Sequence, residues 1–289
     1  MKYYKGLGTS TAAEARDYFS DLATHQLDFD LLREGDGDLV DMAFSKKRVE
    51  DRKTWLRSLE PGAFVDYGVD ALAYKDFVHK ELSLFSVADN QRSIPCVVDG
   101  LKPSQRKVLF ACFKRKLKRE IKVAQLAGYV SEHSAYHHGE ASLTGTIVGM
   151  AQDFVGSNNV NLLAPCGQFG TRIMGGKDAA SSRYIFTKLE AVARKVFHPD
   201  DDAVLKYLDD DGQSIEPNYY VPVLPLALCN GADGIGTGWA TSVPNYDPKQ
   251  LIAVLRRMIA HAGDGVDCDE TSLLATCAAE DVGADGLAP

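Results

Sequence analysis

The dipeptide Arg183–Tyr184 places a guanidinium directly beside a phenol, at the end of the segment GTRIMGGKDAASSRYIFT, residues 170–187. A phenol is a weak nucleophile at neutral pH, because its ordinary pKa is about 10 and roughly one molecule in a thousand is ionised. A neighbouring guanidinium favours the phenolate and can hold a phosphate through two parallel hydrogen bonds. The pair could therefore attack a phosphodiester and form a covalent intermediate. The alternative is a surface arginine beside a half-buried tyrosine, since two residues alone match many proteins.

A histidine pair upstream, in SAYHHGEASLTGTIVGMAQDFVGSNNVNLL (residues 134–163), offers a proton carrier. An imidazole titrates near neutral pH and can hydrogen-bond a reacting oxygen, which makes His138 the candidate. The alternative for His138 is a cap at a helix start, and the adjacent His137 is interpreted as structural.

The glycine-rich stretch GADGIGTGW, residues 231–239, predicts a tight turn that exposes one apolar side chain, Ile235. An exposed isoleucine can enter between base pairs and bend DNA. The alternative is a core isoleucine. A nucleotide-binding glycine loop is excluded, because no lysine follows as in a P-loop and no βαβ unit surrounds the stretch.

The net charge of −8 hides an uneven distribution. Residues 102–122 hold nine Lys or Arg and one acid, whereas residues 264–289 hold seven acids and no base. Affinity for a polyanion depends on the local field and on the phosphates neutralised. The basic run therefore supplies candidate phosphate contacts, and a solvated helix face is the alternative. These candidates are Lys102, Arg106, Lys107 and Lys122.

Periodicity and turn residues predict a mixed α+β chain. A helix is expected to start at Ser10 or Thr11, and further helices are expected over 44–58, 74–89, 104–117, 122–132, 139–154 and 247–260, with a turn at 34–38 and β structure within 219–242. Short helices joined by tight turns, one of them basic, favour a helix-turn-helix or winged-helix DNA binder. Residues 156–183 would then form the wing and the loop that delivers Tyr184.

These segments, together with KYYKGLGTS (residues 2–10), AFSKKRVEDRKTWL (43–56) and DNQRSIPCVVDGLKPSQRKVLF (89–110), resemble the breakage-reunion core of a eukaryotic-type DNA topoisomerase II, a type IIA topoisomerase. The resemblance runs from Lys2 to about Ile259 in the family's order. A bacterial gyrase A-like subunit fits less well, because KYYKGLG and the tyrosine lie in one chain here.

The resemblance implies a domain order. Residues 1–60 would end a TOPRIM domain, 74–198 would form a winged-helix DNA-cleavage domain, and 199–260 would start an α/β tower domain. Residues 261–289 are expected to be an acidic low-complexity tail, disordered or artefactual.

The resemblance also implies an activity: ATP-dependent, transient double-strand breakage of DNA through a 5′-phosphotyrosyl link, strand passage and religation. Tyr184 would be the nucleophile, Arg183 and Arg92 would be active-site cations, Lys5 would lie near the cleavage site, and Ile235 would bend the DNA. A nuclear homodimer acting on double-stranded DNA is expected. The alternative function is a non-cleaving winged-helix DNA-binding module, a decayed or truncated copy.

Mg²⁺ and ATP are the cofactors that the resemblance implies for the full-length enzyme. Their ligands are expected outside this chain, so the fragment alone is expected to be inactive. The acidic runs Asp36–Asp38, Asp200–Asp202 and Asp209–Asp211 are interpreted as turns and solvated loops rather than metal ligands. The six cysteines lack zinc spacing, and the longest apolar run, 221–229, is too short to span a bilayer, so no membrane partner is expected.

Overall fold

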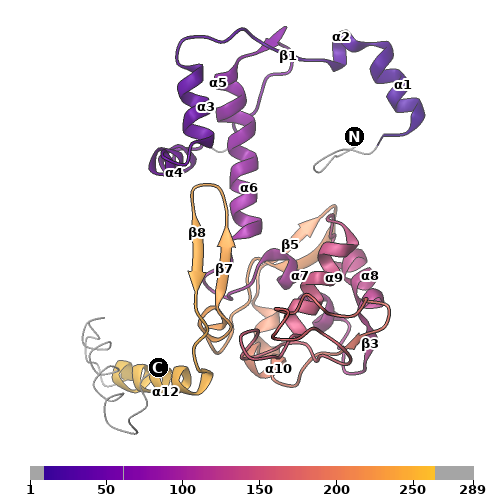
Figure 1. Ribbon diagram of the computed structural model, residues 1–289, viewed down its shortest axis with the longest axis vertical. Helices are drawn as coiled ribbons and strands as arrows, with labels where there is room; N and C mark the ends of the chain where they lie inside the picture. Colours follow the sequence, from indigo (N-terminus) through magenta and orange to yellow (C-terminus); the bar gives the residue numbers. More distant parts are fainter. Residues whose placement is uncertain (1–9, 61, 264–289) are drawn as a thin grey trace.

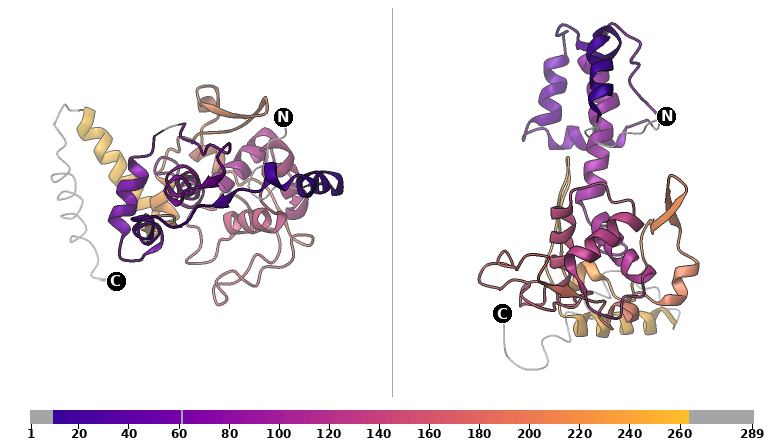
Figure 2. Two further views of the ribbon diagram at one scale, coloured as in Figure 1. Left: turned by 90° about the horizontal axis from the view of Figure 1, so that it is seen from above. Right: turned by 90° about the vertical axis from the view of Figure 1, so that its right-hand side faces the viewer.

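A computed structural model describes residues 10–60 and 62–263 of the chain. Figure 1 shows an N-terminal module, residues 12–76, above a central module, residues 101–217. One long helix descends from the first module toward the second, and a β-hairpin runs beside it. The two further views in Figure 2 show the same stacking along the long axis.

The N-terminal module is mainly helical. It contains α1 (Ala12–Ser20), α2 (Leu22–His25), α3 (Asp36–Phe44), α4 (Val49–Arg57) and α5 (Tyr74–Asp76), with β1 (Asp28–Phe29) paired parallel to β2 (Ala71–Leu72). Thr11 caps α1, since its hydroxyl accepts a hydrogen bond from Glu14 N while the Glu14 carboxylate accepts from Thr11 N.

A turn was predicted over residues 34–38, but the structure has a turn only at residues 34 and 35. Gly35 adopts a left-handed conformation with φ 91°, and α3 starts immediately after it. Two acids in the first turn of α3, Asp36 and Asp38, favour a helix start because they complement the helix dipole.

The long helix combines α5, a π-helical segment η1 (Phe77–Leu82) and α6 (Ser83–Ser93), so the helix predicted over 74–89 is confirmed and continues to Ser93. Its upper part packs on the N-terminal module through Val78, which belongs to a buried cluster with Met42, Trp55 and Leu56. The lower part of α6 therefore projects from a fixed base toward the central module.

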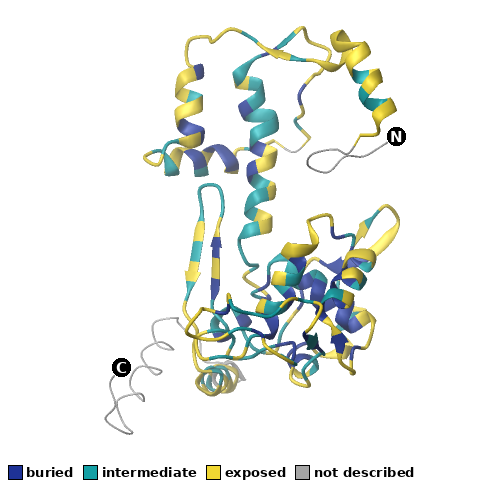
Figure 3. Ribbon diagram, turned by 45° about the vertical axis from the view of Figure 1, so that its right-hand side comes forward, coloured by how far each residue is buried: buried dark blue, intermediate teal, exposed yellow. Residues whose placement is uncertain are grey.

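The central module is built on α7 (Pro103–Lys114), α8 (Val123–His133) and α9 (Glu140–Ala151), which confirms the three predicted helices. Apolar side chains from all three, including Leu109, Leu126 and Ile147, are fully buried in one core. Figure 3 shows this concentration of buried residues. The strands β3 (Ile121–Lys122) and β4 (Phe186–Thr187) pair antiparallel at its edge.

The remaining elements complete an α+β fold. They are α10 (Ala193–Val196), the 3-10 helix η2 (Pro199–Ala203), β5 (Tyr207–Asp210), β6 (Gln213–Pro217), α11 (Leu226–Cys229), β7 (Ala232–Ile235), β8 (Ala240–Val243) and α12 (Pro248–Gly263). The β structure predicted within 219–242 is limited to the antiparallel hairpin β7–β8, because the preceding residues contain Pro222 and Pro225, which cannot donate to a strand ladder. The winged-helix and tower assignments stay predictions.

A buried ion pair fixes the start of α7. Asp99 is fully buried and accepts hydrogen bonds from Arg106 Nε at 2.8 Å and from the backbone N–H of Leu101 and of Tyr220, both at 3.0 Å. Burial by itself lowers the pKa of Arg106, but the hydrogen bonds and charge of Asp99 outweigh it and raise that pKa. The prediction that Arg106 contacts DNA phosphate is therefore wrong, because its guanidinium faces the interior.

Replacing Arg106 by methionine should lower the free energy of unfolding by about 3–5 kcal/mol, because the Asp99 carboxylate would stay buried without its cation. The control is Lys118→Met, an exposed position in the same basic run, expected to change stability by no more than about 0.5 kcal/mol. Urea denaturation measures both variants. Equal losses would mean that the pair contributes nothing specific to stability.

Candidate nucleic-acid interface

One cavity brings together predicted residues that lie far apart in the sequence. It has a volume of about 350 Å³ and lies where α6, α7, the start of α9 and the end of β7 meet. Its lining includes Arg92, Lys102, Lys107, His138 and Ile235. Neither Arg183 nor Tyr184 is among the described residues that line it.

The cations of this cavity differ in what they are free to bind. Arg92 is exposed in the last turn of α6, and Lys102 is half-buried at the N-cap of α7. Lys107 instead places its ammonium 2.9 Å from the buried carboxylate of Glu216 and donates to the Ser134 carbonyl. The ammonium of Lys107 therefore already pairs with a buried carboxylate, and its contact with phosphate stays a prediction.

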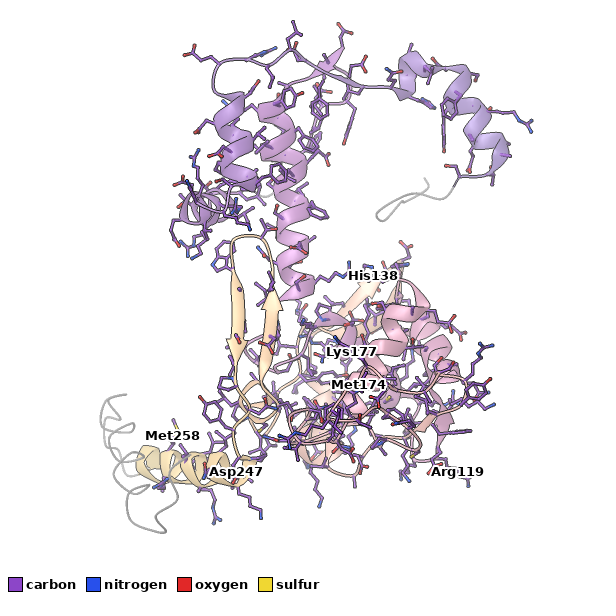
Figure 4. All side chains as sticks on the ribbon, in the orientation of Figure 1. Arg119, His138, Met174, Lys177, Asp247 and Met258 are labelled. Atoms are coloured by element: carbon purple, nitrogen blue, oxygen red, sulfur yellow. The ribbon has the colours of Figure 1, made fainter. Side chains whose placement is uncertain are left out.

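His138 lies at the edge of the cavity, just before α9. Figure 4 shows it on the upper rim of the central module, beside the lower end of α6. The ring of Tyr136 packs edge-on against it with centroids 5.4 Å apart, and the Tyr136 hydroxyl donates to Ser142 Oγ at 3.2 Å. The neighbouring His137 lies 3.1 Å from an Asp210 carboxylate oxygen.

The Arg183–Tyr184 pair lies on a turn held against the start of α8. The backbone N–H groups of Val123 and Ala124 donate to the carbonyls of Ile185 and Ser182 at 3.0 and 3.1 Å. This bracing fixes the backbone on both sides of Tyr184, whose side chain is 75% exposed. Arg183 is also exposed. The turn therefore presents both side chains outward on a fixed backbone.

Lys122 lies beside the Arg183–Tyr184 turn rather than in the cavity. It is the N-cap of α8, it is exposed, and it pairs across the β3–β4 ladder with Phe186. Its ammonium lies 6.0 Å from the centre of the Phe186 ring, two residues beyond Tyr184. The remaining predicted residue, Lys5, lies outside the described residues.

The loop before Tyr184 is closed by a few short-range contacts. The side-chain amide of Gln152 donates to the carbonyls of Phe169 and Gly176 at 2.8 and 3.1 Å. Asp178 accepts hydrogen bonds from the backbone and hydroxyl of Thr171, and the backbone bond lowers the pKa of Asp178. Figure 4 shows Met174 and Lys177 projecting from this loop on the front of the central module.

Two features of the interface were missed in the sequence. Asp89 lines the cavity one helical turn before Arg92, and the only signal that could have found it was their spacing of three residues. The exposed cation Arg172, in the closed loop, had no pattern to distinguish it from an ordinary turn residue.

Acids of two of the acidic runs have structural partners. Asp36 is buried and accepts from Arg33 N at 2.8 Å, while Asp202 makes a two-pronged ion pair with Arg194. Across residues 10–60 and 62–263, no three His, Cys, Asp or Glu side chains converge as metal ligands.

Comparison with known proteins identifies the family. Residues 92–268 match the family of A-type subunits of DNA gyrase/topoisomerase IV, and residues 1–90 match the C-terminal associated domain of TOPRIM. The first match covers more than half of the chain, so the chain belongs to this DNA gyrase/topoisomerase IV family. In the part of the chain that the structure describes, no helix combines the length and apolar character needed to span a membrane.

Within this family the chain resembles the eukaryotic enzymes. It is 60% identical to DNA topoisomerase 2 of Arabidopsis thaliana and 57% identical to that of Saccharomyces cerevisiae, each over 90% of this chain and 18% of the relative. A crystal structure of the Plasmodium falciparum topoisomerase II DNA-binding, cleavage and re-ligation domain matches with a TM-score of 0.74 and 57% identity, over 90% of this chain and 35% of that one. The predicted resemblance to eukaryotic-type topoisomerase II is confirmed.

Adding a methyl group at Gly170 should loosen the loop that leads to Tyr184. Gly170 has φ 98°, and a Cβ there would lie 2.6 Å from the backbone of Gly176. We expect Gly170→Ala to cost about 1–3 kcal/mol of unfolding free energy more than Gly175→Ala, because overpacking adds to backbone strain. Gly175 is the matched control, since it has φ 59° with nothing within 4 Å of a Cβ. Chemical denaturation compares the two, and equal costs would contradict the close approach.

Proposed function

We propose that this chain is the DNA-cleaving segment of a type II DNA topoisomerase. The observation that carries the proposal is the exposed Tyr184 beside Arg183 on a braced turn, in a module whose cavity collects Arg92, Lys102 and His138. The chain spans 18% of the length of its DNA topoisomerase 2 relatives, so the activity proposed is that of a larger enzyme to which these residues contribute.

In the proposed reaction, the Tyr184 oxygen attacks a backbone phosphorus of DNA. The phenol loses its proton, a bond forms between the Tyr184 oxygen and phosphorus, and the bond from phosphorus to the 3′ oxygen breaks. The 3′ oxygen leaves as a hydroxyl after gaining a proton, and the 5′ end stays linked to the tyrosine. One phosphodiester replaces another, so the step reverses readily and the strand can be resealed.

Arg183 is proposed to hold the reacting phosphate, because its guanidinium is exposed on the same turn as the phenol. His138 is proposed to hydrogen-bond a reacting oxygen, and Arg92, which shares its cavity, to supply a further positive charge. These groups lie on separate elements of the chain, so a phosphate backbone crossing the module would be the common ligand that joins them.

Ile235 is proposed to bend the bound duplex by entering between base pairs. Its side chain is 82% exposed at the end of β7, which argues against the alternative of a core isoleucine. Lys102 and Lys122 are proposed phosphate contacts, which position a duplex without reading its sequence. Lys5 keeps its proposed place near the cleavage site.

The remaining expectations follow from the whole enzyme that the relatives represent. We propose a homodimer on double-stranded DNA, in the nucleus, with ATP and Mg²⁺ bound by residues other than those described. The division into TOPRIM end (1–60), winged-helix cleavage domain (74–198) and tower start (199–260) is kept as a proposal. A non-cleaving DNA-binding module has no observation in its favour beyond the absence of a metal cluster among the described residues.

The decisive test is Tyr184→Phe in a longer chain that includes an acidic TOPRIM motif, assayed with Mg²⁺. Covalent protein–DNA adducts trapped by denaturant should disappear, because only the hydroxyl forms the new bond. Duplex affinity should stay within a few-fold, because the cations supply it. The control is Tyr219→Phe, an exposed tyrosine in another segment, which should leave adduct formation intact. An adduct that survives in Tyr184→Phe would exclude this residue as the nucleophile.

Salt dependence tests which cations contact phosphate. Replacing Lys102 by glutamine should reduce the slope of log affinity against log salt by about 0.9, whatever the duplex sequence, because one phosphate contact is lost. Lys249→Gln is the control, since this exposed lysine lies on α12, away from the cavity. Fluorescence anisotropy on unrelated duplexes gives the slopes. An unchanged slope for Lys102→Gln would place this lysine away from the DNA.

A further inference from the structure

The hairpin that carries Ile235 needs support from the rest of the chain. β7 and β8 pair antiparallel from Ala232 with Val243 to Ile235 with Ala240. The tip is closed by a hydrogen bond from Gly236 N to the Trp239 carbonyl at 2.9 Å. An isolated two-stranded hairpin is marginally stable in water. The contacts along its length therefore decide where Ile235 points.

These contacts come from the last turns of α6 and converge on Thr237, at the hairpin tip. The Thr237 hydroxyl donates to Asp89 Oδ2 at 3.2 Å, and the Asn90 side-chain amide donates to the Thr237 carbonyl at 3.1 Å. Ser93 Oγ donates to the other Asp89 oxygen at 3.2 Å, which keeps the carboxylate oriented toward the hairpin. Both the side chain and the backbone of Thr237 are thus held by one helix.

Two glycines let the hairpin lie directly on this helix. A Cβ at Gly236 would be 2.1 Å from Asn90 Oδ1, and one at Gly234 would be 2.3 Å from the Ser93 carbonyl oxygen. On the other side of the tip, the Arg57 guanidinium of α4 lies 5.6 Å from the centre of the Trp239 ring. Figure 1 shows the hairpin running alongside α6 toward the N-terminal module.

The same part of α6 carries Arg92, one turn after Asp89 and in the same cavity as Ile235. A change in how the tip is held would therefore alter the placement of Ile235 relative to Arg92. We propose that Thr237 is a positioning residue. Its hydrogen bonds to Asp89 and Asn90 hold the tip of the hairpin against α6 and so orient Ile235 for bending DNA. The bending part of this inference rests on the proposed function of Ile235.

The attachment of the hairpin tip to α6 through Thr237 is tested first without DNA, by amide hydrogen exchange in the 289-residue chain. Thr237→Val keeps the shape but loses the hydroxyl, so exchange at the Gly236 amide should rise about 10-fold, as for the loss of one hydrogen bond to a charged group. Thr237→Ser keeps the hydroxyl and should stay within about 2-fold of the unchanged chain, since the bond to Asp89 is retained. Equal exchange rates in the two variants would show that the Thr237 hydroxyl does not hold the hairpin tip on α6.

Bending is then measured by fluorescence transfer across a short duplex labelled at both ends. Thr237→Val should lose bending in the same direction as Ile235→Ala, with affinity unchanged within a few-fold, and Thr237→Ser should bend as the unchanged chain does. A valine variant that bends normally, while Ile235→Ala does not, would overturn the positioning role and leave Ile235 as the bending residue.

A failure of the proposed function of Ile235 can be distinguished from a failure of the positioning role of Thr237. If Ile235→Ala leaves bending unchanged, or if no duplex is bound, the proposed function of Ile235 fails and the positioning role in bending fails with it. The exchange difference between Thr237→Val and Thr237→Ser still decides whether Thr237 holds the hairpin. Thermal melting of each variant serves as the control for global unfolding.

Discussion

The buried carboxylate of Asp99 is the constraint on which the arrangement of the central module depends. It accepts hydrogen bonds from the loop after α6, from Arg106 in α7 and from the backbone of Tyr220, more than a hundred residues further along the chain. A fully buried charge is costly unless each of its oxygens is satisfied. These bonds therefore tie the loop between α6 and α7, the start of α7 and the segment before the hairpin β7–β8 to one point.

Two cations of α7 that were predicted to contact phosphate are paired with buried carboxylates. Arg106 faces Asp99, which precedes α7, and Lys107 faces Glu216, which follows it by about a hundred residues, so two adjacent cations hold α7 to segments on both sides of it in the sequence. Successive helical residues point in directions about 100° apart, which lets one helix reach two separate carboxylates. Of the four predicted phosphate contacts, the half-buried Lys102 and the exposed Lys122 stay in the proposal.

The α6 helix links the proposed bending and cleavage residues. Its upper part packs in the N-terminal module, its last turn presents Arg92, and its side chains hold the tip of the β7–β8 hairpin. The Arg183–Tyr184 turn is supported separately, by the start of α8. A DNA duplex that reached both places would be positioned by elements whose separation is set by the packing of α6, α7 and α8.

Helical periodicity, cap residues and glycine turns were enough to predict the helices of the central module, the α+β class and, through ordered motifs, the family. They were enough because these signals are local, and each helix buries its apolar face as its sequence indicates. The sequence could not show which of the cations pair with a buried carboxylate. Lys102, Arg106 and Lys107 look alike in the chain, and only tertiary structure places Asp99 and Glu216 beside two of them. Likewise the turn around Ile235 was predicted from its glycines, whereas its support by Asp89 and Asn90 depends on residues nearly 150 positions away that come together only in the folded chain.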